Sequence, residues 1–207
     1  MTSCLEDQAV SHDYFFLECL GLDPCGATKQ YQARAQAGWL CPGCLVILPG
    51  TGPVDIELED RRPNNRPIDG AFGMGVVLVH REFLERLPGE VVQGELYVGK
   101  VAGDHGPLED WACVHPVQRT IVRGTTQAGT RTCPSCGRDL YSALESDNLC
   151  PPPPEGVRIM APGVGFCLVV RDEMMAYVDR TKWKRLRVDK LDVLDEPRDG
   201  VKRDLVP

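Results

Sequence analysis

Two segments of the chain share one pattern of apolar and polar positions. The first is GMGVVLVHREFLERL (73–87), where four consecutive apolar residues predict a buried strand and the following residues have helical spacing up to a Pro-Gly stop. The alternating ELYVGKV (95–101) predicts a half-exposed strand. At an offset of 90 residues the pattern returns in GVGFCLVVRDEMMAY (163–177) and RLRVDKL (185–191). The sequence therefore predicts two similar strand–helix–strand units.

The remaining segments complete an α+β fold. The stretch HDYFFLECL (12–20) predicts one further strand, so we expect residues 1–40 to form an N-terminal extension that contains it. We expect residues 41–130 and 131–207 to hold the two units, together in one compact domain. The proline-rich CPPPPEG (150–156) predicts a connector, because proline lacks the backbone donor that a central strand or helix interior requires.

Composition and length are those of an ordinary soluble, globular protein. The chain has 207 residues, of which 43% are hydrophobic and 26% charged. Its apolar runs all fall short of the roughly 18 residues that a membrane-spanning helix needs. The N-terminal MTSCLEDQAVSHDYFF is acidic before any apolar stretch, the reverse of a secretory signal. We therefore expect a cytoplasmic protein whose thiols stay reduced.

The formal net charge of −7 at pH 7 indicates which partners suit the chain. Such a charge repels phosphate backbones and favours a basic protein partner, which makes nucleic acid a less suitable ligand. The exception is RTKWKRLR (180–187), where five basic residues surround Trp183. That stretch supports an alternative hypothesis, a zinc-ribbon protein that contacts nucleic acid through residues 180–187.

Two CPxC pairs, Cys41/Cys44 and Cys133/Cys136, carry the chemistry that the sequence makes visible. The spacing suits a metal site, a redox dithiol or a disulfide framework. A proline after the first cysteine fixes φ in the turn, and Gly137 after the second pair can adopt a positive φ that turns N–H groups toward the thiolates. Four sulfurs make a closed structural zinc site. We therefore predict one Zn²⁺ ligated by all four cysteines, which ties the two units together.

The redox and disulfide alternatives have weaker support. WLCPGC resembles a thioredoxin-type motif, but such enzymes place the first cysteine at a helix N-terminus. Here LVILPGTG follows the second cysteine, and its Pro and Gly predict no helix. Disulfides suit short secreted chains better than a chain of this length with paired spacings.

Three further residues are candidate metal ligands: Cys113 and His115 in DWACVHP, and Cys150. The commoner fate of such a cysteine is to be a small buried apolar residue. The longer stretch GDHGPLEDWACVH (103–115) could pair Cys113 with His105 or His115 as nucleophile and base, yet no third group is placed to orient the base. No P-loop, nucleophile elbow or metalloprotease motif is present, so we expect no enzymatic activity and no catalytic residue.

Together, the two knuckles, the YFFLE strand and the C-terminal apolar strand leading to a helix resemble the double-CXXCG-motif proteins of myxobacteria. Some of these are named as immunity proteins of swarming-inhibition toxin systems. The resemblance covers residues 13–196 in the order of features, and its specific part is the two knuckles. It implies a small zinc protein that binds and neutralises a cognate protein toxin. A scaffolding protein with another partner is a third hypothesis.

Overall fold

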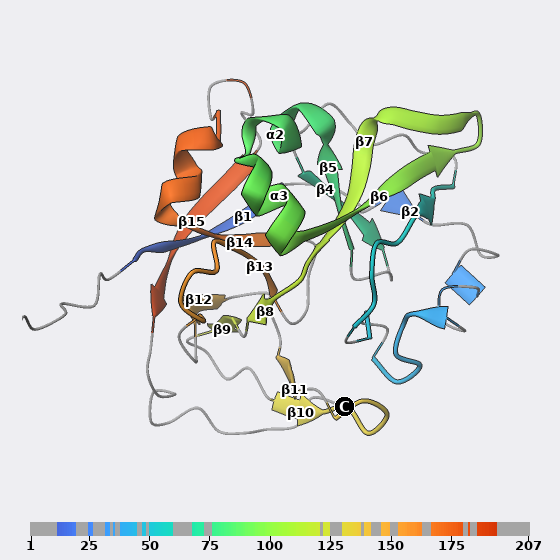
Figure 1. The fold of residues 1–207 in the computed structure, drawn as a ribbon. Coiled ribbons are helices and arrows are strands. Elements are labelled where there is room, and N and C mark those ends of the chain that lie inside the picture. Colours follow the sequence, from blue (N-terminus) through green and yellow to red (C-terminus); the bar gives the residue numbers. More distant parts are fainter. Residues whose placement is uncertain are drawn as a thin grey trace, which may run out of the picture.

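The computed structural model arranges the chain as two mixed β-sheets with few helices (Figure 1). The residues that it describes are 12–19, 25–26, 32–33, 35, 38–44, 47–48, 50–59, 68–72, 76–120, 122–124, 130–137, 139–141, 146–149, 153–162, 167–179, 182 and 186–193.

The first sheet has six strands. Its two outer pairs are parallel and its three inner pairs are antiparallel. In spatial order the strands are β2 (Cys25–Gly26), β4 (Ile68–Phe72), β5 (Val76–His80), β7 (Gly106–Pro116), β6 (Leu96–Gly103) and β3 (Ile56–Glu57). The predicted strands within 73–87 and 95–101 are confirmed as β5 and β6.

The second sheet has seven strands, with the strand predicted in residues 12–20 at its centre. In spatial order they are β8 (Arg119–Thr120), β13 (Ile159–Pro162), β14 (Leu168–Arg171), β1 (Tyr14–Cys19), β15 (Leu186–Val193), β12 (Ser146–Leu149) and β9 (Val122–Gly124). A separate two-stranded hairpin joins β10 (Thr130–Thr132) to β11 (Asp139–Tyr141).

Three short helices follow the buried strands. Helix α2 (Arg81–Arg86) begins after His80, whose ring accepts a hydrogen bond from the Glu82 N–H, and it ends before Pro88 as predicted. Helix α3 (Gly89–Glu95) begins directly after that proline and was not predicted, because the Pro-Gly pair suggested only an end. In the second segment the helix is a 3-10 helix, η1 (Asp172–Tyr177).

The main core lies between the two sheets. On β5, Val77 and Val79 face this core, where they join Leu17 of β1 and Val170 of β14. The alternate residues of β5, including Leu78, face a second core on the outer side of the first sheet. Both faces of β5 are therefore covered, which explains its uninterrupted apolar run. Burying each such side chain contributes about 1.5–3 kcal/mol relative to exposure.

The two sheets share one pairing plan. From β2 to β3, and again from β8 to β12, the pairs are parallel, antiparallel, antiparallel, antiparallel and parallel. In this plan β1 occupies the position of β7. Within the described residues, the seventh strand, β9, has no counterpart in the first sheet.

The offset between corresponding strands corrects the sequence alignment. Ile68 pairs with Val79, as Ile159 pairs with Val170, so corresponding residues of the hairpins are 91 apart rather than 90. The predicted offset of 90 matched Leu78 with a β14 residue that faces the opposite side of its sheet. A slip of one residue reverses the faces of a strand, so the offset of this hairpin is 91. The strands β6 and β15 keep the predicted offset of 90, because Val98 pairs with Val114 of β7 as Val188 pairs with Leu17 of β1.

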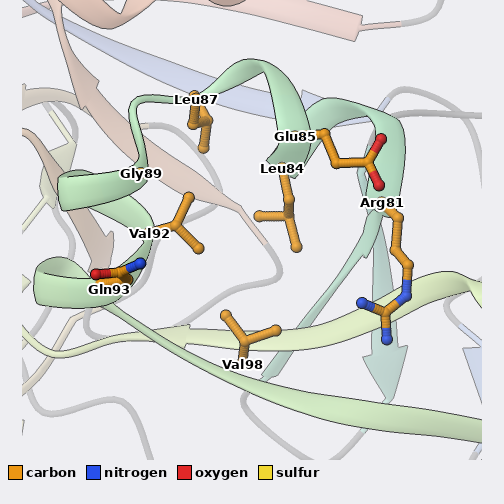
Figure 2. A pocket seen from close by; sticks show the side chains of 8 residues that line it. All are labelled: Arg81, Leu84, Glu85, Leu87, Gly89, Val92, Gln93 and Val98. Atoms are coloured by element: carbon orange, nitrogen blue, oxygen red, sulfur yellow. The ribbon is translucent and has the colours of Figure 1, made fainter.

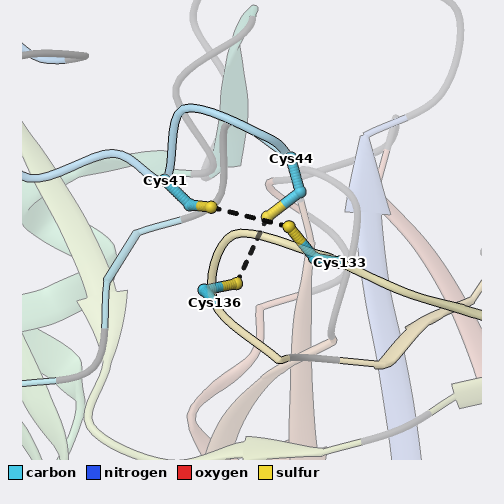
Figure 3. A group of neighbouring side chains, drawn as sticks. All are labelled: Cys41, Cys44, Cys133 and Cys136. Carbon is cyan, nitrogen blue, oxygen red and sulfur yellow. Dashed lines mark hydrogen bonds between the residues drawn. The ribbon is translucent and has the colours of Figure 1, made fainter.

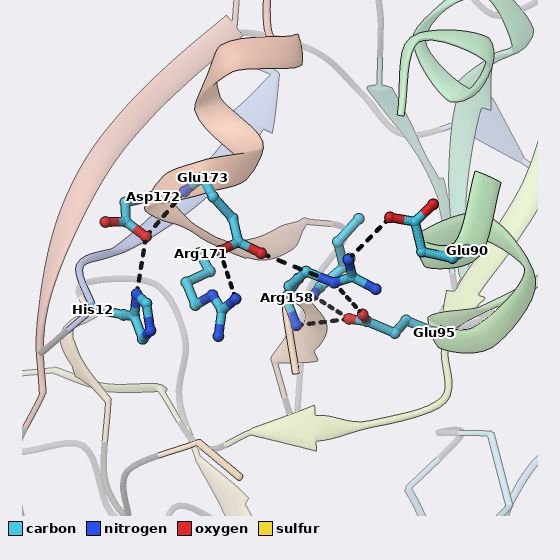
Figure 4. A network of polar contacts seen from close by, with 8 residues as sticks. His12, Glu90, Glu95, Arg158, Arg171, Asp172 and Glu173 are labelled. Atoms are coloured by element: carbon cyan, nitrogen blue, oxygen red, sulfur yellow. Dashed lines mark hydrogen bonds and ion pairs between the residues drawn. The ribbon is translucent and has the colours of Figure 1, made fainter. Parts of the chain in front are cut away.

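A polar network joins α3 to the second sheet (Figure 4). The Glu95 carboxylate accepts hydrogen bonds from the backbone N–H groups of Arg158 and Ile159, at 2.6 and 2.8 Å. It also pairs with the Arg158 guanidinium, whose Nε lies 2.7 Å from Glu95 Oε1, and Arg158 in turn contacts Glu90. This network fixes the start of β6 against β13.

Among the helices that the structure describes, none is long and apolar enough to cross a membrane.

Candidate metal centre

Each CPxC pair lies at the tip of a short antiparallel turn. Leu40 bridges to Ile47 around the first pair, and Thr132 pairs with Asp139 around the second, so each turn encloses six residues. In the second turn Gly137 has a φ of +69°, and its N–H donates to the Cys133 carbonyl oxygen at 2.9 Å. The predicted positive φ at this glycine is confirmed.

The two turns bring four sulfur atoms together (Figure 3). Cys41 Sγ lies 3.6 Å from Cys133 Sγ, and Cys44 Sγ lies 3.8 Å from Cys136 Sγ. All four sulfurs lie within 4.8 Å of one another. Four sulfurs at 2.3 Å from a tetrahedral metal would be about 3.8 Å apart, whereas a disulfide bond measures about 2.05 Å. The cluster therefore has the dimensions of a metal site and not of a disulfide.

The backbone around the cluster favours thiolates. Burial alone would raise the pKa of Cys133, but the N–H groups of Ser135 and Cys136 lower it to about 6. Burial also opposes ionisation of Cys41, and the N–H groups of Gly43 and Cys44 overcome it, so the pKa of Cys41 is likewise lowered. Thiolate is the form that ligates metal, so these N–H groups prepare the site for a cation.

Gly43 permits the close approach of the two turns. A Cβ at this position would lie 2.6 Å from Ser135 Oγ and 3.0 Å from Cys133 Sγ. Gly43 is not among the glycines with positive φ, so its turn does not require glycine for backbone conformation. Its role is to leave room for the opposite turn.

The donor set limits the chemistry. Four thiolates in tetrahedral arrangement suit Zn²⁺ or iron, and they complete the coordination of such an ion without an open position. Cys41 and Cys133 are almost fully buried, while Cys44 and Cys136 are partly exposed. The cluster is compatible with a closed metal site that links two turns 92 residues apart in the chain.

The additional candidate ligands lie elsewhere. Cys113 is buried in β7 within the outer core of the first sheet, and burial and the charge of Asp55 raise the pKa of its thiol. His115 Nε2 lies 2.8 Å from the Gly52 carbonyl oxygen, and its ring packs on Tyr97. Within the described residues, neither side chain belongs to a group of ligand atoms close enough together to hold a metal ion. Cys150 lies outside the described residues.

The structure also groups His12, Asp172 and Glu173, which sequence analysis did not select. His12 Nδ1 lies 3.5 Å from Asp172 Oδ1 (Figure 4), and both carboxylates are exposed. Their 160-residue separation gives no motif. Glu173 already pairs with Arg171, which makes this group an ion-pair cluster.

A groove of about 400 Å³ lies between α2, α3 and β6 (Figure 2). Leu84, Leu87, Val92 and Val98 line it with apolar surface, and Arg81, Glu85, Gly89 and Gln93 complete the lining. No side chain of this lining is a cysteine, serine or histidine that could pair as nucleophile and base.

No protein-family model and no curated protein sequence matches the chain. A proposal for its function therefore rests on the motifs of the sequence and on the geometry of the cysteine cluster.

Proposed function

We propose that the protein binds one structural zinc ion through Cys41, Cys44, Cys133 and Cys136 and acts by binding another protein. The observation that carries the proposal is the closed set of four sulfurs at tetrahedral spacing. Such a site leaves no position for an activated water, so its contribution is to folding rather than to turnover.

Metal analysis tests the zinc site directly. Freshly purified protein should contain one equivalent of zinc per chain, and Cys136→Ser should lose most of it together with several kcal/mol of stability. Cys113→Ala is the matched control, because it removes a buried thiol outside the cluster. Less than half an equivalent of zinc in untreated protein would contradict the proposal.

The two halves of the chain are proposed to be duplicated units related by an approximate two-fold axis through the metal site. Near such an axis, corresponding residues meet each other. Cys41 lies against Cys133 and Cys44 against Cys136, each pair 92 residues apart. The shared pairing plan of the two sheets supports the same relation, and so do the reciprocal contacts of β1 with β4 and of β7 with β13.

The partner is proposed to be a basic protein toxin, which the chain neutralises. The net charge of −7 favours encounter with a basic surface, and the resemblance to immunity proteins supplies the class of partner. Nucleic-acid binding is the alternative. Within 180–187 the structure describes Lys182, Leu186 and Arg187; Lys182 pairs with Glu82, and Arg187 pairs with Asp189. These pairs favour the protein partner.

Co-expression tests this choice. When the protein is produced with the product of a neighbouring toxin-like gene, we expect growth to be restored and the two proteins to co-purify at low salt. Retention on heparin or DNA resin at modest salt, without such a partner, would favour the nucleic-acid alternative.

A further inference from the structure

The cysteine cluster consists of a buried pair and a partly exposed pair. The inner pair, Cys41 and Cys133, is only 1% exposed at each residue, whereas the outer pair, Cys44 and Cys136, remains partly exposed. Each pair takes one sulfur from each turn, and the two Sγ atoms are 3.6 Å apart in the inner pair and 3.8 Å apart in the outer pair (Figure 3). A reagent dissolved in water therefore meets the outer pair first.

The backbone also distinguishes the two pairs. Cys41 accepts hydrogen bonds from the N–H groups of Gly43 and Cys44, and Cys133 accepts them from the N–H groups of Ser135 and Cys136. Hydrogen bonds to a thiolate stabilise its charge and thereby reduce its nucleophilicity. The inner sulfurs are thus protected both by burial and by the backbone of their own turns.

The two turns touch directly beside the outer pair. A Cβ at Gly43 would lie 2.6 Å from Ser135 Oγ and 3.1 Å from Ser135 Cβ, and the next residue of each turn is an outer cysteine. To form a disulfide bond, the outer sulfurs must move from 3.8 Å to about 2.05 Å apart. The contact between the turns already places them on facing segments.

The cluster is separate from the main core between the sheets. Its sulfurs form a small group of their own with Leu48, and none of the four cysteines belongs to the main core. The hairpin β10–β11, which carries Cys133 and Cys136, is a sheet apart from the two large ones. A change of bonding in the cluster therefore leaves the packing between the large sheets in place.

We propose that the cluster is a peroxide-sensitive switch, in which hydrogen peroxide oxidises Cys44 and Cys136 to a disulfide bond between the two turns and the metal ion leaves. One outer thiolate attacks the O–O bond, becomes a sulfenic acid and releases hydroxide. The other outer thiolate attacks the sulfenic sulfur, forms the S–S bond and releases a second hydroxide. Two protons from water convert both hydroxides to water, so the two electrons given up by the sulfurs reduce one peroxide molecule.

The switch exchanges one link between the turns for another. Zn²⁺ leaves because thiolates are its ligands and only the inner two remain. The disulfide bond then joins the turns that the metal had joined. A dithiol reductant supplies two electrons and two protons, restores the outer thiols and allows zinc to bind again. This inference rests on the proposed function, because it describes the regulation of the same metal site.

Coordination to zinc has a competing effect, because it lowers the nucleophilicity of all four sulfurs. In that case the site is purely structural and inert toward peroxide. The experiment must therefore measure metal release and disulfide formation together, and it must separate a reversible switch from oxidative damage.

The test uses the full chain, loaded with one equivalent of zinc and treated with hydrogen peroxide in the presence of a zinc indicator. We expect zinc release at least about tenfold faster than in buffer alone, at the rate at which a Cys44–Cys136 disulfide appears in mass spectra of the unreduced protein. Dithiothreitol should restore both the thiols and zinc binding. Retention of zinc, a disulfide bond between any other cysteines, or sulfinic acid that the dithiol does not reverse would overturn the proposal.

Variants identify the pair that reacts. The double variant Cys41→Ser with Cys133→Ser keeps the outer pair and should still form the disulfide bond, whereas Cys44→Ser with Cys136→Ser should form no disulfide between the turns. Cys113→Ala lacks a buried thiol outside the cluster and should release zinc as the unmodified chain does. If Cys113→Ala no longer releases zinc, the outer pair is not the target of peroxide.

The same measurements distinguish failure of the switch from failure of the proposed function. If the purified protein holds one equivalent of zinc and keeps it in peroxide, the zinc site stands and the switch is wrong. If the purified protein holds less than half an equivalent but takes up added zinc, the proposed function fails, while release of the added zinc still decides the switch. If the protein does not take up added zinc, both proposals are wrong.

Discussion

Gly43→Ala is the sharpest test of the two-turn metal site. The new Cβ would lie 2.6 Å from Ser135 Oγ, which is about 0.8 Å short of an ordinary contact of about 3.4 Å. The hydroxyl of Ser135 can rotate away, but the new Cβ would still lie 3.0 Å from Cys133 Sγ and 3.1 Å from Ser135 Cβ. The turns must therefore yield by a few tenths of an ångström, whereas ligand distances in metal sites tolerate only about 0.2 Å. We therefore expect the zinc affinity to fall about 10–100-fold, the range seen when groups that support metal ligands are altered.

Chelator competition, followed by the absorbance of a zinc indicator, measures this change. Gly38→Ala is the matched control, because a Cβ at Gly38 meets nothing within 4 Å and the substitution lies three residues before Cys41. Combining Gly43→Ala with Ser135→Gly removes the closest clash and should restore part of the affinity. If Gly43→Ala binds zinc as tightly as the control, the turns do not meet as described.

Three further outcomes follow from the packing. Gly99→Ala should lower thermal stability by about 1–3 kcal/mol, because its Cβ would lie 1.8 Å from a backbone oxygen; Gly94→Ala, in open space, should not. Glu95→Gln should lower the free energy of unfolding by about 1–3 kcal/mol, because it weakens charge-assisted hydrogen bonds to β13. An unchanged midpoint of denaturant-induced unfolding would contradict this. A circular permutant that joins Val193 to His12 by a short turn should fold and bind zinc, because β15 and β1 are antiparallel neighbours there. An unfolded product would contradict this pairing.

The four-cysteine cluster was predictable from the sequence because its signal is local. A CPxC turn positions two sulfurs by itself, and two such turns make four ligands wherever the fold brings them together. The positive φ of Gly137 was predictable for the same reason. The requirement for glycine at position 43 was not predictable, because it depends on Ser135 of the other turn, 92 residues away.

The sheets were predictable only as separate strands. The apolar runs that became β5 and β14 identify buried strands, but matching them by residue identity aligned Arg81 with Arg171, although Arg171 corresponds to His80 in the fold. Residue identity does not show which face of a strand is covered, and the face determines the true register. The place of β1 was also hidden, because its partners Leu168 and Leu186 lie more than 140 residues away.

The proposed duplication is visible mainly in the parts of the molecule that stabilise the fold. The cysteines proposed to correspond meet at the cluster, and the strands β5 and β14 both contribute to the main core. A site for one cognate partner requires a surface that occurs once. The described structure departs from its own symmetry where β9 covers β12, and where the β6–β7 hairpin continues to Gly106 while β1 begins at Tyr14. Within the described residues, these departures are where the fold offers a surface that occurs once.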